Sequence, residues 1–204
     1  EQVLQSIGKA LLSTESSDDV AEEGTEQSVQ GVNELSLARF VFLLGHCALK
    51  LLQYSETLAG RAKKARQQYE EKEQNHHKGS GEQMGYVTTS EDIEENILES
   101  ISDTELVVNN LIGQFGKVVI ELSINKQGYG SSLQQASLLC FCKFMCISRV
   151  FCEANLNLLC TLLVRSKDEH IRSNLFICIG DLCYRFPNQL EQWTTRIYQV
   201  LQDE

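Results

Sequence analysis

The hydrophobic pattern in the last third of the chain repeats itself after 38 residues. When residues 133–144 are placed on residues 171–182, apolar positions meet apolar positions and Cys140 meets Cys178. Helical self-similarity at a period in this range is typical of α-solenoids, which present long surfaces to partners. The pattern therefore predicts an all-α fold built from repeated helices.

The same region divides into helices that are delimited by apolar periodicity and by the turn residues between them. The predicted helices cover residues 106–125, 132–149, 155–165, 169–185 and 189–201. Capping-box patterns, in which a Ser and a Glu or Gln three residues later cap the first turn, mark three starts. These pairs are Ser102 with Glu105, Ser132 with Gln135, and Ser166 with Glu169. We expect two and a half antiparallel helical hairpins, with the last repeat truncated.

A long helix is predicted from Asn33 onward, because apolar residues there step by three and four positions. The stripe consists of Leu37, Phe40, Leu44, Cys47, Leu51, Tyr54 and Leu58. Further apolar residues widen it, namely Val41, Leu43, Ala48 and Leu52. A stripe of this width predicts burial on more than one side. Helix-forming residues then continue to Glu73 without an apolar stripe, which indicates a solvated extension.

Composition separates the remaining segments. Residues 1–12 have the pattern of a helix end, and the Ser-, Glu- and Gly-rich residues 13–31 predict an acidic loop. The polar, Gly-containing residues 76–90 predict a disordered charged insert. We therefore expect helical repeats over 1–75, the flexible insert, and a second repeat segment over 91–204. Because the chain starts with Glu and stops within a repeat, we expect a fragment of a longer protein.

Charge and cysteine content narrow the function classes. The chain has 204 residues, a hydrophobic fraction of 42% and a formal net charge of −10 at pH 7. This charge argues against a dominant nucleic-acid binder. Eight cysteines without a secretory signal indicate small hydrophobic residues in a reducing compartment, the nucleus or the cytoplasm. No apolar run approaches the roughly 18 residues of a membrane span, so no membrane contact is predicted.

The cysteines do not predict a metal site. Cys140 and Cys142 are about 200° apart around a helix, so they cannot grip one metal together. Cys142 and Cys146 share a face, but the other ligands would have to be Cys160 and His170, which lie beyond a turn. The sequence contains no phosphate-binding glycine loop and no hydrolase elbow. We predict no catalytic residue, metal or cofactor, and keep a redox- or metal-dependent enzyme that uses the cysteines as the rival class.

A basic strip follows the apolar stripe on the long helix. It consists of Arg61, Lys63, Lys64 and Arg66. One interpretation is a contact with DNA phosphates or with an acidic partner. The other is a solvated helix face, because the glutamates from Glu70 onward dilute the positive charge.

Arg185, Trp193 and Arg196 are candidates for a protein contact, because Trp and Arg are enriched in interfaces. The alternative is that Trp193 fills the space between two hairpins. Structural roles within the repeat fit three charged residues: Asp168, Arg172 and Asp181. Asp168 and Arg172 lie four positions apart on a helix and can form an ion pair along it.

Longer strings in the chain resemble a known family. Residues 158–163 and 168–174 resemble a HEAT repeat. The strings similar to condensin complex subunit 1, the family of HEAT-repeat regulatory subunits of condensin I, are residues 43–50, 82–85, 143–148, 151–153, 171–174, 180–188 and 193–194. One departure is Cys183-Tyr184, which stands where the resemblance leads us to expect a smaller apolar pair.

The resemblance implies a HEAT-repeat α-solenoid that works as a non-catalytic scaffold and regulatory segment in mitotic chromosome condensation and cell division. It implies the kleisin subunit and the SMC ATPase subunits as partners in a hetero-oligomeric complex, with DNA as a further contact. The expected location is the nucleus, the chromosome and the cytoplasm. The alternative is a HEAT-repeat adaptor of another complex, either of the cohesin type or in nuclear transport.

Overall fold

The computed structural model describes residues 26–76, 90–125 and 128–202 of the chain. Over these residues the fold is all-α, as predicted, and no β-strand occurs in the described ranges. The elements are α2 (Glu26–His76), α3 (Ser90–Ser100), η2 (Ile101–Asn109), α4 (Leu111–Gln114), α5 (Gly116–Ile124), α6 (Ser131–Ile147), α7 (Arg149–Arg165), α8 (Glu169–Arg185), α9 (Pro187–Glu191) and α10 (Thr194–Gln202). Of these, η2 is a π-helical segment.

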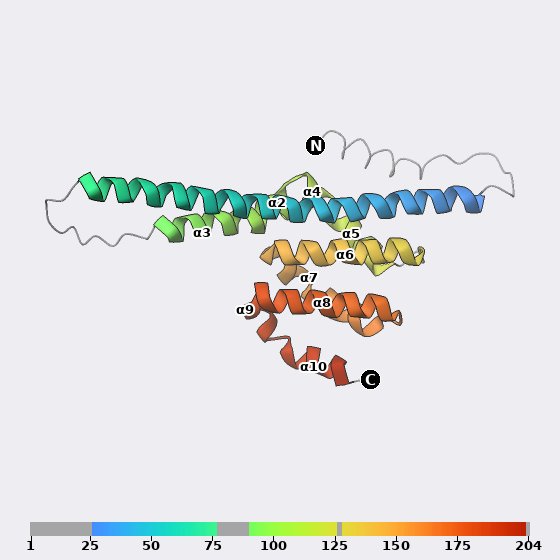
Figure 1. Cartoon of the computed structure of the whole chain (residues 1–204). Coiled ribbons are helices and arrows are strands. Elements are labelled where there is room, and N and C mark those ends of the chain that lie inside the picture. Colours follow the sequence, from blue (N-terminus) through green and yellow to red (C-terminus); the bar gives the residue numbers. More distant parts are fainter. Residues whose placement is uncertain (1–25, 77–89, 126–127, 203–204) are drawn as a thin grey trace.

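Helices α2, α6 and α8 form one layer of the molecule. They lie one beside the next and run in the same direction, with α6 in the middle (Figure 1). Because the layer helices run the same way, the chain has to return between them. It returns through α3 to α5 between α2 and α6, and through α7 between α6 and α8, while α9 and α10 follow α8 (Figure 1). The result is a stack of similar helical units.

Helices α6 and α8 are two copies of one pattern, as the 38-residue offset predicts. Each contains 17 residues, and their first residues, Ser131 and Glu169, are separated by that same offset. Five pairs of equivalent positions are buried in both helices: Leu133 and Ile171, Ser137 and Leu175, Cys140 and Cys178, Phe141 and Ile179, and Phe144 and Leu182. The equivalence therefore extends from sequence to packing.

Aromatic rings join the layer helices to the returning segments. Phe141 and Phe144 of α6 lie edge-to-face against Phe151 of α7, with ring centroids 6.0 and 5.8 Å apart. Phe40 of α2 meets Phe115, directly before α5, in the same geometry at 5.2 Å. Such pairs add to the stabilisation that burial already gives. One continuous core therefore runs through the stack.

The long helix begins earlier than the sequence indicates. α2 starts at Glu26 instead of Asn33, so the last residues of the predicted acidic loop are helical. It ends at His76, in agreement with the predicted extension through Glu73. The predicted helix end over residues 1–12, the rest of the loop and most of the predicted insert lie outside the described residues.

The apolar stripe of α2 is only partly buried. Its buried positions are Phe40, Val41, Leu44, Ala48 and Leu52. Four stripe residues are exposed: Leu43, Leu51, Tyr54 and Leu58. The prediction of burial on more than one side is wrong at these positions. The reason is that the described neighbours cover one side of α2, and periodicity shows that a helix is amphipathic without showing how many neighbours it has.

Between Glu34 and Tyr69, α2 contains a window that is long and apolar enough to cross a membrane, judged by length and composition alone. The expectation that no such run exists is therefore wrong. Part of this window packs in the common core, so the role of a core helix accounts for its apolar composition.

The helix predicted over residues 106–125 is divided into η2, α4 and α5. Asn110 has extended backbone and caps α4, with its Oδ1 accepting a hydrogen bond from the N–H of Leu111 at 2.7 Å. Gly113 lies so close to the carbonyl oxygens of Val107 and Val108 that a Cβ would overlap them. A cap and a close contact therefore interrupt this run, and apolar periodicity registers neither.

The three predicted capping boxes are wrong. The chain is already helical from Ser90, and the hydroxyl of Ser102 donates to the carbonyl of Glu99 within that helical run. Helix α6 follows Gly130 without a side-chain cap. The side chains that cap α7 and α8 are Ser148 and Asp168. Because Ser148 caps α7, this helix begins at Arg149, well before the predicted residue 155. The helix predicted over residues 189–201 is instead two helices, α9 and α10.

Candidate interaction surfaces

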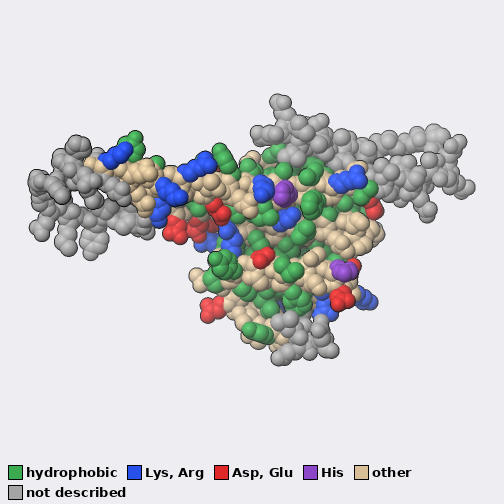
Figure 2. Space-filling model, viewed as in Figure 1, with side chains coloured by type: hydrophobic (Ala, Val, Ile, Leu, Met, Phe, Trp, Pro, Cys, Tyr) green, Lys and Arg blue, Asp and Glu red, His purple; other side chains and the backbone are tan. Residues whose placement is uncertain are grey.

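The basic strip lies on the part of α2 that extends past the end of α6 (Figure 1). Arg61, Lys63 and Lys64 are exposed, and Arg66 is partly exposed. At about 100° per residue, Arg61 and Lys64 lie on one side of the helix, and Lys63 and Arg66 on another. Figure 2 shows Lys and Arg side chains spaced along this part of the molecule. The cations are therefore distributed around a helical arm and do not form a single face.

An acidic pocket adjoins the base of this arm. The open pocket has a volume of about 430 Å³ and is lined by Glu56, Glu95, Asn96, Leu98, Glu99, Ser102, Asp103, Arg185 and Phe186. Figure 2 shows Asp and Glu side chains gathered below the arm, where α3 lies beside α2. Within the pocket, Nη1 of Arg185 lies 3.4 Å from Oε1 of Glu56 and joins α8 to α2.

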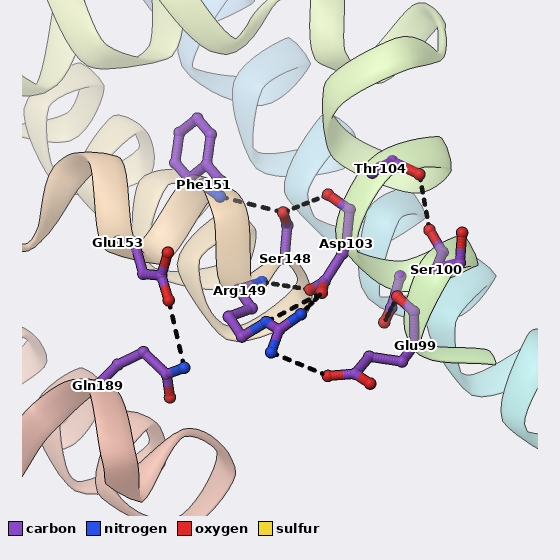
Figure 3. A network of polar contacts seen from close by, with 10 residues as sticks. Glu99, Ser100, Asp103, Thr104, Ser148, Arg149, Phe151, Glu153 and Gln189 are labelled. Carbon is purple, nitrogen blue, oxygen red and sulfur yellow. Dashed lines mark hydrogen bonds and ion pairs between the residues drawn. The ribbon is translucent and has the colours of Figure 1, made fainter. Parts of the chain in front are cut away.

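The buried carboxylate of Asp103 holds η2 against the start of α7 (Figure 3). Its Oδ1 accepts a hydrogen bond from the backbone N–H of Arg149 at 2.7 Å. Its Oδ2 lies 3.1 Å from both Nε and Nη2 of the Arg149 guanidinium. Glu99 adds a contact of 3.3 Å from its Oε1 to Nη1 of Arg149. Ser148 Oγ donates to the carbonyl of Asp103 at 2.7 Å and accepts from the N–H of Phe151 at 3.1 Å. These contacts cap α7 and fix it to η2.

Sequence reasoning missed this network because its members are far apart in the chain. Asp103 and its partners are separated by 45 and 46 residues, so no local pattern shows that they meet. The local signal that was available is Ser148, a residue type preferred at helix starts, directly before α7.

The candidates for a protein contact lie at two places. Arg185 is in the acidic pocket, paired with Glu56. The guanidinium of Arg196 lies over the ring of Trp193, 5.6 Å from its centroid, and Nη1 is 3.4 Å from Oδ1 of Asn157. The Trp193 ring is half-buried and packs against the core. This placement favours the interpretation in which Trp193 fills space between helices.

The charged residues assigned to the repeat also have defined positions. Oδ1 of Asp168 accepts from the N–H groups of His170 and Ile171 at 2.9 and 3.3 Å, so the carboxylate caps α8. The backbone N–H of Arg172 donates to the carbonyl of Asp168 at 3.0 Å. Asp181 is exposed on α8. The carboxylate of Asp168 thus has a structural task at the start of α8.

Buried thiols line the contact between α6 and α8. The thiol of Cys178 on α8 lies beside the thiols of Cys142 and Cys146 on α6 and interacts with them electrostatically. The neighbouring thiol of Cys178, together with burial, raises the pKa of Cys146. Burial raises the pKa of Cys140 and of Cys152 to about 12. These thiols are therefore protonated at neutral pH, the form in which cysteine is least nucleophilic.

All eight cysteines are free thiols, and Cys183 alone among them is exposed. Over the described ranges, no three His, Cys, Asp or Glu side chains are grouped as metal ligands. Cys160 and His170, the two additional ligands that a cysteine site would need, contribute to no such group.

Replacing Asp103 by Asn should lower the free energy of unfolding by about 1–2 kcal/mol, because the half-exposed guanidinium of Arg149 loses a charged partner. Urea denaturation followed by circular dichroism measures this loss. Glu95→Gln, an exposed carboxylate in the same pocket, is the control and should change stability by less than about 0.5 kcal/mol. Equal stability of the two variants would show that the Asp103 network does not stabilise the fold.

Comparison with known proteins gives the chain its relatives. No family model matches it. The chain is 31% identical to condensin complex subunit 1 of Xenopus laevis over 88% of its own length, and 32% identical to that of Schizosaccharomyces pombe over 92%. It is 30% identical to the Mus musculus protein over 99% of its length. The chain spans only 14–17% of the length of these relatives.

The resemblance inferred from the residues is therefore confirmed by three relatives of the same name. Condensin complex subunit 1 is a non-catalytic subunit, in agreement with the prediction that the chain is not an enzyme. From frogs to fission yeast the similarity covers nearly all of this chain and a short part of each relative. The chain is homologous to one segment of condensin complex subunit 1.

Proposed function

We propose that the chain is a HEAT-repeat segment of a condensin regulatory subunit and acts as a non-catalytic scaffold in mitotic chromosome condensation. The observation that carries this proposal is the repeated packing of α6 and α8, taken together with the similarity to condensin complex subunit 1. Stacked helical units share one core and leave long surfaces on both sides for partners. Such an architecture suits assembly of several proteins.

The proposed partners are the kleisin subunit and the SMC ATPase subunits, in the nucleus, on chromosomes and in the cytoplasm. The acidic pocket around Glu56 and Glu99 is a surface on which a basic partner segment fits by charge. Arg185 and Arg196 remain proposed contacts with a protein partner, because each places its positively charged guanidinium at the edge of the stack. In this role the segment works by geometry, holding a partner and adjusting when the ATPase engages or releases.

Affinity purification of the tagged longer protein from mitotic cells should recover kleisin and SMC subunits of condensin in stoichiometric amounts. Quantitative mass spectrometry measures their ratio to the bait. Recovery of cohesin-type subunits or nuclear-transport factors in their place would support the alternative HEAT-repeat adaptor and contradict the proposal.

The arm of α2 supports DNA as a further contact. From Leu52, the last residue of α2 that is buried among the side chains that the structure describes, to His76 the helix extends about 36 Å at 1.5 Å per residue. That length corresponds to about ten base pairs of duplex. Since Arg61 and Lys64 lie on one side and Lys63 and Arg66 on another, the arm offers cations to phosphates in more than one orientation.

Replacing Lys63, Lys64 and Arg66 by Glu should weaken binding to duplex DNA. For each phosphate that is no longer neutralised, the slope of log affinity against log salt should become shallower by about 0.9, because fewer counterions are released. Fluorescence anisotropy at several salt concentrations measures both quantities. The matched control reverses three exposed cations elsewhere: Lys117, Arg165 and Lys167. If both triple variants bind DNA alike, the arm does not contact DNA.

A further inference from the structure

The side of α2 that faces away from the core carries regularly spaced cations. Arg39, Lys50 and Arg61 are exposed and follow each other at intervals of 11 residues. Eleven residues are close to three turns of an α-helix, so the three side chains lie in one row that spans about 33 Å along the axis. The fully buried Ala48 lies about 160° around the helix from Lys50, which places the row opposite the core. We name Arg39, Lys50 and Arg61 the outer row of α2.

The outer row forms no ion pair with a carboxylate in the part of the chain that the structure describes. Between residues 35 and 69, α2 contains a single acidic residue, Glu56, and this carboxylate is paired with Arg185. Lys50 donates a hydrogen bond from its Nζ to the neutral Oε1 of Gln53 at 3.0 Å. This side of α2 therefore carries positive charge, although the whole chain has a net charge of −10.

Large apolar side chains run beside the outer row. Leu43, Tyr54 and Leu58 are between 44% and 60% exposed. Leu43 and Tyr54 are again 11 residues apart, so apolar residues and cations repeat at the same interval. On the other flank Phe42 is exposed as well, and Nζ of Lys143 on α6 lies over its ring, 4.7 Å from the centroid. Figure 2 shows basic and hydrophobic side chains next to each other along α2, so this side of the helix is cationic and apolar at once.

The repeat interval indicates the shape of an occupant for this side of α2. A partner that lies along the helix meets one cation and one large apolar residue again after about 16.5 Å. A second α-helix presents its own side chains at this interval, because 11 residues also take it through three turns. Near the start of the row, an open hollow of about 400 Å³ can receive an apolar side chain; it is lined by Ala38, Arg39, Phe42 and Leu43. The geometry therefore fits a long helix better than a compact ligand.

The chemistry of the surface selects the occupant. Duplex DNA would pair its phosphates with the outer row but leave Leu43, Tyr54 and Leu58 uncovered, because contacts with its backbone are polar. A further layer helix of the same chain would pack through small and apolar residues, as α6 does at Gly45, and would bury the cations of the outer row without partners. A helix with carboxylates beside an apolar stripe satisfies both parts of the surface, and its charge also speeds the encounter of two separate chains.

We propose that the outer row of α2 and the apolar residues beside it bind an acidic amphipathic helix of a partner protein. Carboxylates of the partner pair with the three cations, and its apolar residues cover the exposed apolar side chains. The inference rests on the scaffold part of the proposed function and names the chemistry of one partner segment. Lys63 and Arg66, on another side of the arm, keep their proposed role at DNA.

Photo-crosslinking in the assembled complex tests this contact. Thr57 is exposed and lies in line with the outer row, between Lys50 and Arg61. With p-benzoylphenylalanine in place of Thr57, the longer protein should crosslink to one segment of another subunit. Mass spectrometry should show that this segment has a net negative charge and apolar residues three and four positions apart. The same crosslinker in place of Lys117, which is exposed on α5, should not reach that segment.

Charge reversal supplies a second measurement. The combined variant Arg39→Glu, Lys50→Glu and Arg61→Glu should lower the crosslink yield at residue 57 at least roughly tenfold, because like charges then face each other. Replacing the carboxylates of the crosslinked segment by lysines should restore the yield in this variant. The matched control reverses three exposed cations elsewhere and should keep the original yield: Lys117, Arg165 and Lys167. A yield that survives the first reversal, or that the lysines do not restore, would overturn the proposal.

The remaining outcomes separate this inference from its alternatives. Crosslinks from residue 57 to DNA, to a second copy or to the protein's own chain would overturn the proposal. If condensin subunits co-purify with the longer protein and residue 57 crosslinks to none of them, the helix contact is wrong and the proposed function stands. If the crosslinked acidic helix belongs to a protein outside condensin, the contact stands and the assignment to condensin fails.

Discussion

Burial of α6 from two sides is the interaction on which the rest of the structure depends. On one side Gly45 of α2 lets Cys140 approach, and on the other Cys142 and Cys146 meet Cys178 of α8. Small side chains at these contacts bring the helices together, so that large side chains beside them are fully enclosed. Each large apolar side chain buried in this way contributes about 1.5–3 kcal/mol. Through α6, the long helix and the C-terminal units become one body.

The surfaces that are not buried in this core indicate how the chain can interact with partners. The buried carboxylate of Asp103 and its half-exposed partner Arg149 are occupied in fixing η2 to α7. The buried thiols are held in their protonated form. What remains for partners is a basic helical arm and an acidic pocket beside it. These are features of a protein that is held within an assembly, in keeping with its similarity to a condensin subunit.

The sequence predicted those parts of the fold that depend on long uninterrupted periodicity. Apolar periodicity predicted the bounds of α8, and the 38-residue offset predicted its equivalence with α6. The structure confirms the equivalence, because five equivalent positions are buried in both helices. Local patterns failed where a distant partner decides the outcome. Asp103 looked like part of a helix start, yet it holds Arg149 on another helix. Leu51 and Leu58 looked buried, but burial depends on how many neighbours surround α2, which one helix cannot reveal.

Hydrogen exchange of the folded chain, resolved by peptide, measures the two-sided burial of α6 most directly. Amides of residues 133–147 should exchange only when the whole stack unfolds, and therefore more slowly than those of α8. Amides of α2 beyond Leu58 should exchange fastest of the three, because no described core residue lies there. Exchange of α6 before α8, or at the rate of the α2 arm, would contradict a structure organised around α6.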